Sequence, residues 1–154
     1  MKILILSDTH GEISAAERII RWEKPDQVIH LGDCIRDAED LERPFPYLPI
    51  CKVPGNNDWF TDCPKEKTVR FGDTNVFLCH GHTTGVKGGP HLQITRALQT
   101  GATVSLFGHT HTPYLEEESG VLLINPGSIT YKGTYALLWI IPGEKPKAEI
   151  KYDR

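Results

Sequence analysis

Short, mostly apolar runs that end in polar clusters are the main pattern of this chain. Runs of four to six apolar and β-branched residues, bounded by Gly, Pro or polar residues, are typical of buried strands. Five of them are followed at once by a cluster rich in Asp, Asn and His: Ile3 to Leu6, Val28 to Leu31, Ile50 to Val53, Val76 to Cys79 and Val104 to Phe107. Side chains just past strand ends converge at one edge of a sheet, where open α/β folds place their sites.

Between these runs, the spacing of apolar residues predicts two helices. Residues Ile13 to Lys24 have helical periodicity and are followed by Pro25, and His91 to Gln99 form the second helix. Asp37 to Leu41 predict no more than a short acidic turn of helix. The other strand-like runs are Thr68 to Phe71, Tyr114 to Glu118, Val121 to Ile124, Tyr135 to Ile141 and Ala148 to Tyr152. This order predicts an α/β fold in which two sheets pack face to face with helices outside.

Length and charge narrow the class of protein. The 154 residues are predicted to form a single domain, 1-154, and 17 Lys and Arg against 20 Asp and Glu give a net charge of −3. No basic run is present, so an extended nucleic-acid groove is not expected, because duplex binding needs a positive face. No apolar stretch is long enough for a signal peptide or a membrane helix, so we expect a cytoplasmic protein without membrane contact.

The polar clusters contain residues that bind divalent metals. The seven candidate ligands are Asp8, His10, Asp33, Asn56, His80, His109 and His111. Asp8 and His10 are two positions apart, so in an extended segment their side chains would point the same way; His109 and His111 repeat this spacing. The imidazole-rich set suits Mn²⁺, Fe²⁺, Zn²⁺, Ni²⁺ or Co²⁺ better than Ca²⁺ or Mg²⁺. Seven ligands are too many for one tetrahedral site and suit two ions that share Asp33.

The order and spacing of the clusters resemble the motifs of the calcineurin-like metallophosphoesterases. The similar segments are Asp8-x-His10, Gly32-Asp33, Gly55-Asn56-x-Asp58, the Cys-His-Gly-His stretch around His80, Gly108-His109-x-His111 and Ile124-Asn125-Pro126-Gly127-Ser128. Within that superfamily, the chain is most similar to the compact bacterial and archaeal phosphodiesterases. The resemblance implies a four-layer αββα sandwich of two mixed β-sheets flanked by helices. It also implies two metal sites, one formed by Asp8, His10, Asp33 and His111 and the other by Asp33, Asn56, His80 and His109.

One position departs from the pattern of many superfamily members. They carry a histidine directly after the metal-binding Asn, as the proposed general acid for the leaving group, whereas this chain has Asn57. An amide cannot protonate a leaving group at neutral pH, and general acid catalysis is worth roughly 10²–10⁴-fold, so slow turnover of natural esters is expected. His82 is the candidate substitute acid. Asn57 is expected to orient the phosphoryl group, and Asp58 to orient the ligands by hydrogen bonding to a ligand histidine.

Two histidines lie outside the ligand set. His30 falls inside an apolar run and is expected to be buried in the core or behind the ligands. His91 opens the second predicted helix and is expected to be exposed. Neither is predicted to bind metal.

Together these features predict a binuclear-metal phosphodiesterase. Its substrate would be a small phosphodiester or nucleotide, attacked in line by a hydroxide that bridges two ions, with Mn²⁺ favoured. Two alternatives stay open: a phosphomonoesterase, and a non-catalytic protein-interaction scaffold, the role of a eukaryotic retromer subunit that resembles this fold. A scaffold does not need every ligand, so the complete set of seven favours the enzyme. The aromatic residues Phe45, Tyr47, Trp59 and Phe60 are predicted to line either a substrate pocket or a contact between copies of a homo-oligomer.

Overall fold

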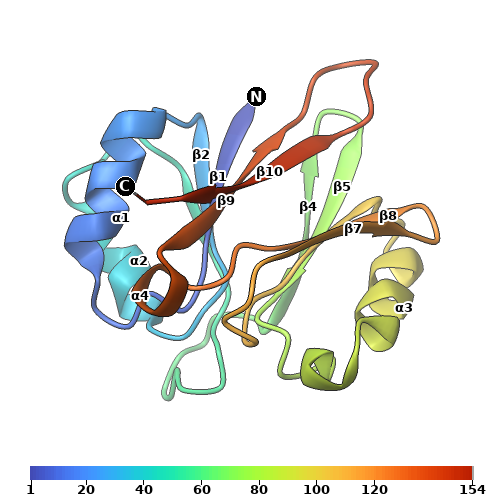
Figure 1. The fold of residues 1–154 in the computed structure, drawn as a ribbon, viewed down its shortest axis with the longest axis horizontal. Coiled ribbons are helices and arrows are strands. Elements are labelled where there is room, and N and C mark those ends of the chain that lie inside the picture. Colours follow the sequence, from blue (N-terminus) through green and yellow to red (C-terminus); the bar gives the residue numbers. More distant parts are fainter. Residues whose placement is uncertain (154) are drawn as a thin grey trace.

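Two five-stranded β-sheets form the centre of the protein in a computed structural model, which describes residues 1–153 (Figure 1). The first sheet has the strand order β10-β9-β1-β2-β3. Its strands are β1 (Lys2–Leu6), β2 (Gln27–His30), β3 (Ile50–Lys52), β9 (Thr134–Trp139) and β10 (Lys147–Tyr152). β1, β2 and β3 run parallel, whereas β9 is antiparallel to both β1 and β10, so the sheet is mixed.

The second sheet is also mixed and has the order β4-β5-β6-β8-β7. Its strands are β4 (Glu66–Phe71), β5 (Thr74–Cys79), β6 (Val104–Leu106), β7 (Tyr114–Glu118) and β8 (Val121–Asn125). The three central strands are parallel, and the edge strands β4 and β7 pair with them in the antiparallel sense. The two sheets therefore present the ends of parallel strands at the same side of the molecule, where the polar clusters follow.

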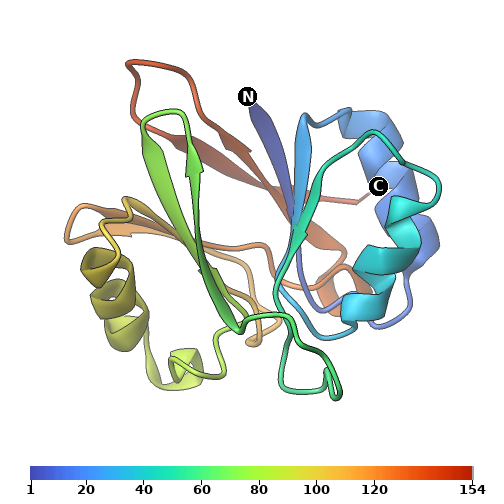
Figure 2. The same cartoon turned by 180° about the vertical axis from the view of Figure 1, so that it is seen from behind.

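Helices cover the outer face of each sheet (Figures 1 and 2). Against the first sheet lie α1 (Ile13–Glu23) and α2 (Ile35–Glu42), and against the second lie α3 (His91–Gln99) and the 3₁₀ turn η1 (Val86–Gly88). A fourth helix, α4 (Ile129–Lys132), connects β8 of the second sheet to β9 of the first. The predicted four-layer αββα sandwich is confirmed.

Alternation along the strands produces three apolar layers. In β1, Ile3 and Ile5 enter the core between the sheets, whereas Leu4 and Leu6 face the layer beneath α1 and α2. Phe77 of β5 likewise packs in the layer beneath α3. Successive side chains of a strand point to opposite faces, so a continuous apolar run is needed where both faces are covered. That requirement explains why the strands before the polar clusters lack the polar alternation of an exposed sheet.

Two helices differ from the expectation. The predicted short turn at Asp37 to Leu41 is an eight-residue helix, α2, and α4 was not predicted. Helix α2 has no side-chain cap of its own, because its first residues are capped by a carboxylate from a distant loop. Helix α4 has a local cap, in which the Ser128 hydroxyl accepts from the backbone N–H of Tyr131.

Among residues 1–153, no helix is long and apolar enough to cross a membrane.

The four aromatic residues that were predicted to line a pocket or an oligomer contact differ in burial. Phe45 packs against the apolar layer beneath α1, with the Arg21 guanidinium 4.9 Å from its ring centroid. Tyr47, Trp59 and Phe60 are exposed. Phe45 is therefore part of the fold, and together with Tyr47 it also lines a shallow surface pocket apart from the ligands.

Candidate metal centre

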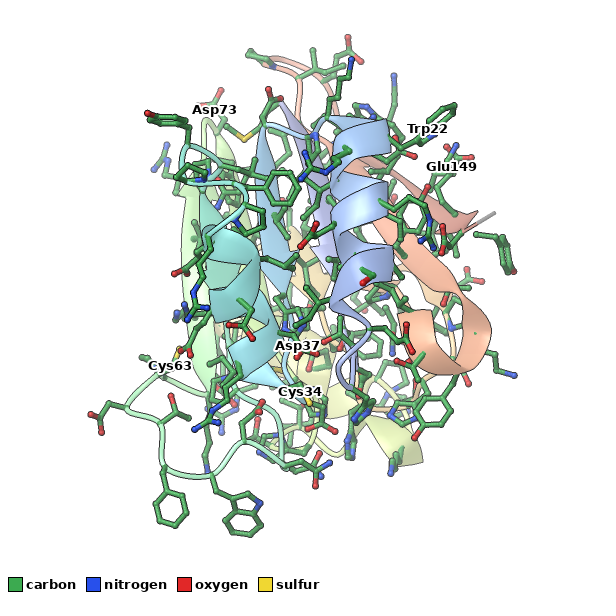
Figure 3. The ribbon with its side chains drawn as sticks, turned by 90° about the vertical axis from the view of Figure 1, so that its left-hand side faces the viewer. Trp22, Cys34, Asp37, Cys63, Asp73 and Glu149 are labelled. Carbon is green, nitrogen blue, oxygen red and sulfur yellow. The ribbon has the colours of Figure 1, made fainter. Side chains whose placement is uncertain are left out.

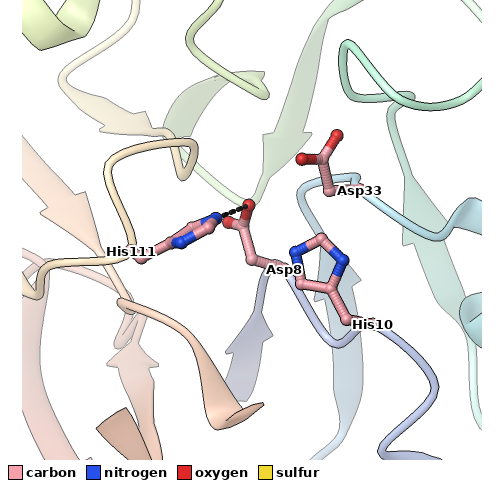
Figure 4. Close-up of side chains that lie close together, drawn as sticks. All are labelled: Asp8, His10, Asp33 and His111. Carbon is pink, nitrogen blue, oxygen red and sulfur yellow. Dashed lines mark ion pairs between the residues drawn. The ribbon is translucent and has the colours of Figure 1, made fainter. Parts of the chain in front are cut away.

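The polar clusters meet where the ends of the two sheets lie side by side. Asp8 and His10 follow β1, Asp33 follows β2, and His111 follows β6 of the other sheet. One ligand atom from each of these four residues lies within 4.8 Å of the other three (Figure 4). The structure therefore brings together the whole first ligand set implied by the sequence.

The backbone directs these side chains in a way that the sequence pattern did not indicate. Asp8 and His10 have φ angles of 53° and 43°, and His109 and His111 have 69° and 58°. The expectation that an extended backbone aims each pair in one direction is therefore wrong, because all four residues have a left-handed backbone conformation. Asp33, with a φ of 54°, has this conformation as well. Positive φ angles are uncommon outside glycine and cluster at functional sites, where the surrounding structure enforces them.

Two glycines allow the loops to approach the carboxylates. A Cβ added at Gly55 would collide with Asp33 Oδ1, and one at Gly108 would lie 2.8 Å from Asp8 Oδ2 and collide with the Ser7 hydroxyl. Each glycine comes from the polar cluster of a different strand. The backbone at Gly55 and Gly108 therefore packs directly against the two carboxylates and helps to fix their position.

Only one oxygen of Asp8 is hydrogen-bonded. Oδ2 accepts from the Ser7 hydroxyl and, at 3.1 Å, from the backbone N–H of His109. Oδ1 is buried and has no hydrogen-bond partner among the described residues, although it approaches His111 Nε2 to 3.0 Å. Asp8 is therefore held by one oxygen and presents the other to the centre.

His80 is arranged in the same way. Its Nδ1 lies 2.7 Å from the carbonyl oxygen of Leu31, which can only accept, so Nδ1 carries the proton. Nε2 then has a free lone pair, and it lies 3.5 Å from Asp33 Oδ1 and 3.9 Å from Asp8 Oδ1. His80 thus faces both carboxylates with the nitrogen that can bind a metal.

A divalent cation fits these groups. In the part of the chain that the structure describes, Asp8 Oδ1, His10 Nε2 and His80 Nε2 are buried and lack hydrogen-bond partners. Leaving such groups unpaired is costly, and native proteins rarely do so without water, an ion or a functional reason. Carboxylate oxygen combined with imidazole nitrogen suits first-row divalent metals.

The second implied ligand set is looser. The rings of His80 and His109 lie 5.0 Å apart between centroids, and Asn56 is exposed on the loop after β3. Within residues 1–153, three or more carboxylate, histidine or cysteine ligand atoms lie within 4.8 Å of one another only in the first set. Burial, followed by the nearby His80 and Lys87, lowers the pKa of His109 to about 4, so its lone pair is free at neutral pH.

Asn57 and His82 lie beside the ligands. The Asn57 backbone N–H donates to Asp33 Oδ1 at 3.1 Å and its side-chain Nδ2 donates to Oδ2 at 2.9 Å, so Asn57 holds the carboxylate that two ions would share. The half-buried His82 ring lies 5.5 Å from that of His80. Burial, together with His80 and Lys65, lowers the pKa of His82, which disfavours the protonated form of its ring.

Asp58 orients the site through backbone groups. Its Oδ1 accepts from the N–H groups of Cys34 and Ile35, at 3.0 and 2.9 Å, and its Oδ2 accepts from Gly55 at 2.7 Å. The expectation that Asp58 accepts from a ligand histidine is wrong: its partners are backbone amides at the start of α2 and the backbone amide of Gly55. Because Asp33 directly precedes Cys34, these bonds fix the backbone beside the bridging carboxylate.

A buried polar chain behind the ligands was not predicted as a unit. Gly32 N–H donates to His30 Nδ1 at 3.2 Å, so the ring proton is on Nε2, which lies 3.0 Å from Thr9 Oγ1. The Thr9 hydroxyl in turn donates to Asp37, which also accepts from Gly11 N–H at 2.8 Å. Asp37 and Cys34 lie at the end of α2 nearest the site (Figure 3). The expectation that His30 is buried is confirmed. The one sequence signal for this hydrogen-bonded network was Thr9, a threonine between the two candidate ligands Asp8 and His10.

Asn125, from the Ile124 to Ser128 segment, supports the loop that carries His109 and His111. Its Nδ2 donates to the carbonyl of Gly108 at 3.0 Å and to the hydroxyl of Thr110 at 2.9 Å. Its Oδ1 accepts from Gly127 N–H at 2.9 Å. Asn125 therefore stabilises the loop without lying among the ligands.

Comparison with known proteins agrees with this geometry. Residues 1–140 match the family model of the calcineurin-like phosphoesterase superfamily domain. The chain is 36% identical to the probable metallophosphoesterase YsnB of Bacillus subtilis, over 84% of this chain and 75% of that one. It is 33% identical to the phosphodiesterase MJ0936 of Methanocaldococcus jannaschii, over 82% and 83% of the two chains. A solved structure of a predicted phosphoesterase from Streptococcus pneumoniae superposes with a TM-score of 0.77 at 25% identity, over 97% of both chains. The protein belongs to the calcineurin-like phosphoesterase superfamily, which confirms the resemblance.

Proposed function

We propose that this metal-dependent phosphoesterase is a binuclear phosphodiesterase that hydrolyses small phosphodiesters. The observation that carries the proposal is the set of buried, unpaired ligand atoms on Asp8, His10 and His80, gathered around the carboxylate of Asp33. The names of its relatives, metallophosphoesterase and phosphodiesterase, support the reaction class.

Two ions would share Asp33. The first would be held by Asp8, His10, Asp33 and His111, and the second by Asp33, Asn56, His80 and His109. Bound divalent ions supply Lewis acidity toward phosphoryl oxygens and lower the pKa of water at the site. Among the metals that suit these ligands, Mn²⁺ is the one that we favour, ahead of Ni²⁺, Zn²⁺, Fe²⁺ and Co²⁺.

The side chains of the protein prepare the ligands and limit the choice of leaving group. Asn57 fixes both oxygens of Asp33, and the carbonyl of Leu31 fixes the tautomer of His80. The lowered pKa of His82 makes its charged form less available than that of an ordinary histidine, which limits its use as a general acid toward a departing alkoxide. Esters with a good leaving group should therefore react much faster than alkyl esters.

The scaffold alternative is not favoured. Unpaired buried ligand atoms lower the stability of a protein, and so does a left-handed backbone at five candidate ligands. A protein that only binds partners would gain nothing in return for these costs. A phosphomonoesterase would use the same ligands. The assay below separates the two esterases.

The test is hydrolysis of bis-p-nitrophenyl phosphate by metal-stripped protein titrated with Mn²⁺. Its leaving group needs little protonation, so Asn57 should not prevent turnover. Asp33→Ala should lower the rate by at least about 100-fold, because the bridging ligand is lost. Asp73→Ala, which removes an exposed carboxylate in the β4–β5 turn (Figure 3), is the matched control and should keep the wild-type rate.

Absence of nitrophenolate release with Mn²⁺ and then with Ni²⁺ would contradict the proposal. Faster hydrolysis of p-nitrophenyl phosphate than of the diester would identify a monoesterase instead.

A further inference from the structure

Tyr131 of helix α4 packs against two candidate ligands of the first ion. Its ring is stacked on His111, with centroids 4.6 Å apart and planes 9° from parallel. The same ring meets His10 edge to face, at 5.7 Å and 78°. His10 and His111 are themselves 5.6 Å apart, so the three rings form one aromatic cluster at the edge of the metal centre.

The segment that carries Tyr131 is tied to the loop after β1. The Ser128 hydroxyl donates to the carbonyl of Asp8 at 2.8 Å, and the Thr130 hydroxyl donates to the carbonyl of Thr9 at 2.6 Å. Those bonds fix α4 to the first sheet's loop, while the Tyr131 ring covers His111 from the second sheet's loop. Helix α4 therefore joins the two loops that supply most of the first ligand set.

Ligand imidazoles need a partner that fixes their orientation. Metal-binding histidines are usually oriented by a hydrogen bond from the second ring nitrogen, as His80 is by the carbonyl of Leu31. His10 and His111 instead have an aromatic ring packed against them, and both have left-handed backbone. Offset-stacked and edge-to-face pairs are favourable and directional, so such a ring restricts how an imidazole can turn.

Tyr131 contributes little to the stability of the fold. Its side chain is 61% exposed and belongs to a helix of four residues, so it adds little to the apolar core. Tyr152 on β10 has a similar exposure, 66%, and lies in a cavity lined by α1 and β10, apart from the ligands. Tyr152 therefore serves as a matched control.

We propose that Tyr131 is a positioning residue whose ring holds His10 and His111 in the orientation that binds the first ion. The inference rests on the proposed metal centre and goes beyond it, since it assigns a function to a residue that would not touch the ion. The inference also predicts that the aromatic ring of Tyr131, rather than its hydroxyl, determines the affinity for the first ion.

Equilibrium binding of Mn²⁺ tests this inference without any need for turnover. Metal-stripped wild type, Tyr131→Ala, Tyr131→Phe and Tyr152→Ala would be titrated with Mn²⁺, with the free ion measured by electron paramagnetic resonance. Tyr131→Ala should weaken one class of Mn²⁺ site by about tenfold and leave the other unchanged. Tyr131→Phe and Tyr152→Ala should bind like wild type, and urea unfolding of the metal-free proteins should show that all variants fold alike.

Wild-type affinity at both sites in Tyr131→Ala would overturn the inference, and so would an equal loss in Tyr131→Phe. A wild-type protein that binds neither Mn²⁺ nor Ni²⁺ would overturn the proposed function and this inference together. Weaker Mn²⁺ binding in Tyr131→Ala alone, at one class of site, would support the inference, and the hydrolysis assay tests the proposed function separately.

Discussion

His30 is a buried histidine behind the metal centre, and it makes the stability of the folded protein depend on pH. Burial lowers its pKa to about 4, and neighbouring carboxylates such as Asp37 offset only part of that effect. The ring is therefore neutral in the folded protein, in agreement with the bond that its Nδ1 accepts from Gly32. In the unfolded chain, the same side chain would titrate near its ordinary pKa of about 6.5.

Stability of the metal-free protein should consequently fall as the pH drops below neutrality. Between the unfolded pKa of about 6.5 and the folded pKa of about 4, only the unfolded state binds the proton, which favours unfolding. Lowering the pH from about 7.5 to about 5.5 should reduce the free energy of unfolding by about 1.4 kcal/mol through His30 alone. Urea unfolding at the two pH values measures the change.

The variant His30→Gln should lose that share of the pH dependence. His91→Gln, which replaces an exposed histidine at the start of α3, should keep it. Equal slopes in wild type and His30→Gln would show that His30 is not held neutral.

The identity of the candidate ligands could be predicted from the sequence, but their orientation could not. Asp, Asn and His residues directly after apolar runs are visible locally, so Asp8 and Asp33 could be assigned to one edge of the fold. The left-handed backbone at Asp8 depends on how distant loops close around it, including the approach of Gly108. The contact of Tyr131 with His111 leaves no trace in local spacing, because it depends on where α4 crosses between the sheets.

At the scale of elements, α2 depends on a loop that lies far from it in sequence. The helix begins after Cys34, whose φ is 82°, and Asp58 accepts hydrogen bonds from the backbone N–H groups of Cys34 and of the first helical residue, Ile35. A carboxylate at a helix N-terminus satisfies unpaired donors and interacts favourably with the helix dipole. The sequence predicted only a short turn here because the cap comes from the loop after β3.

Replacing Asp58 should therefore destabilise the fold as well as the metal centre. Asp58→Ala leaves three N–H groups without their acceptor, which should lower the free energy of unfolding by about 1–3 kcal/mol. Chemical denaturation of the metal-free protein measures this loss. Asp62→Ala removes an exposed carboxylate of the same loop and is the control; an equal effect of the two substitutions would contradict the capping role.

For the whole molecule, the decisive feature is that the ligands come from both sheets. Asp8, His10 and Asp33 follow strands of the first sheet, whereas His80 and His111 follow strands of the second. An ion held among them would connect the two sheets only when they are packed against each other. Metal binding should therefore favour the folded state over the unfolded chain.

Thermal unfolding offers a measure of this coupling. Mn²⁺ at about 100 times its dissociation constant should add about 2.7 kcal/mol, which corresponds to a rise in Tm of about 5–10 °C for a chain of this size. A chelator should reverse the shift, and Asp33→Ala should abolish it. An unchanged Tm in wild type would mean that Mn²⁺ does not bind selectively to the folded protein.

The distribution of the site along the chain also has a consequence for biosynthesis. Asp8 leaves the ribosome about 100 residues before His111, and the α4 segment that contacts His111 follows later still, when most of the domain has been made. A growing chain therefore holds incomplete, scattered ligands for most of its translation. Binding of a metal would then follow folding of the domain, and the ion would be selected by the folded protein rather than by the nascent chain.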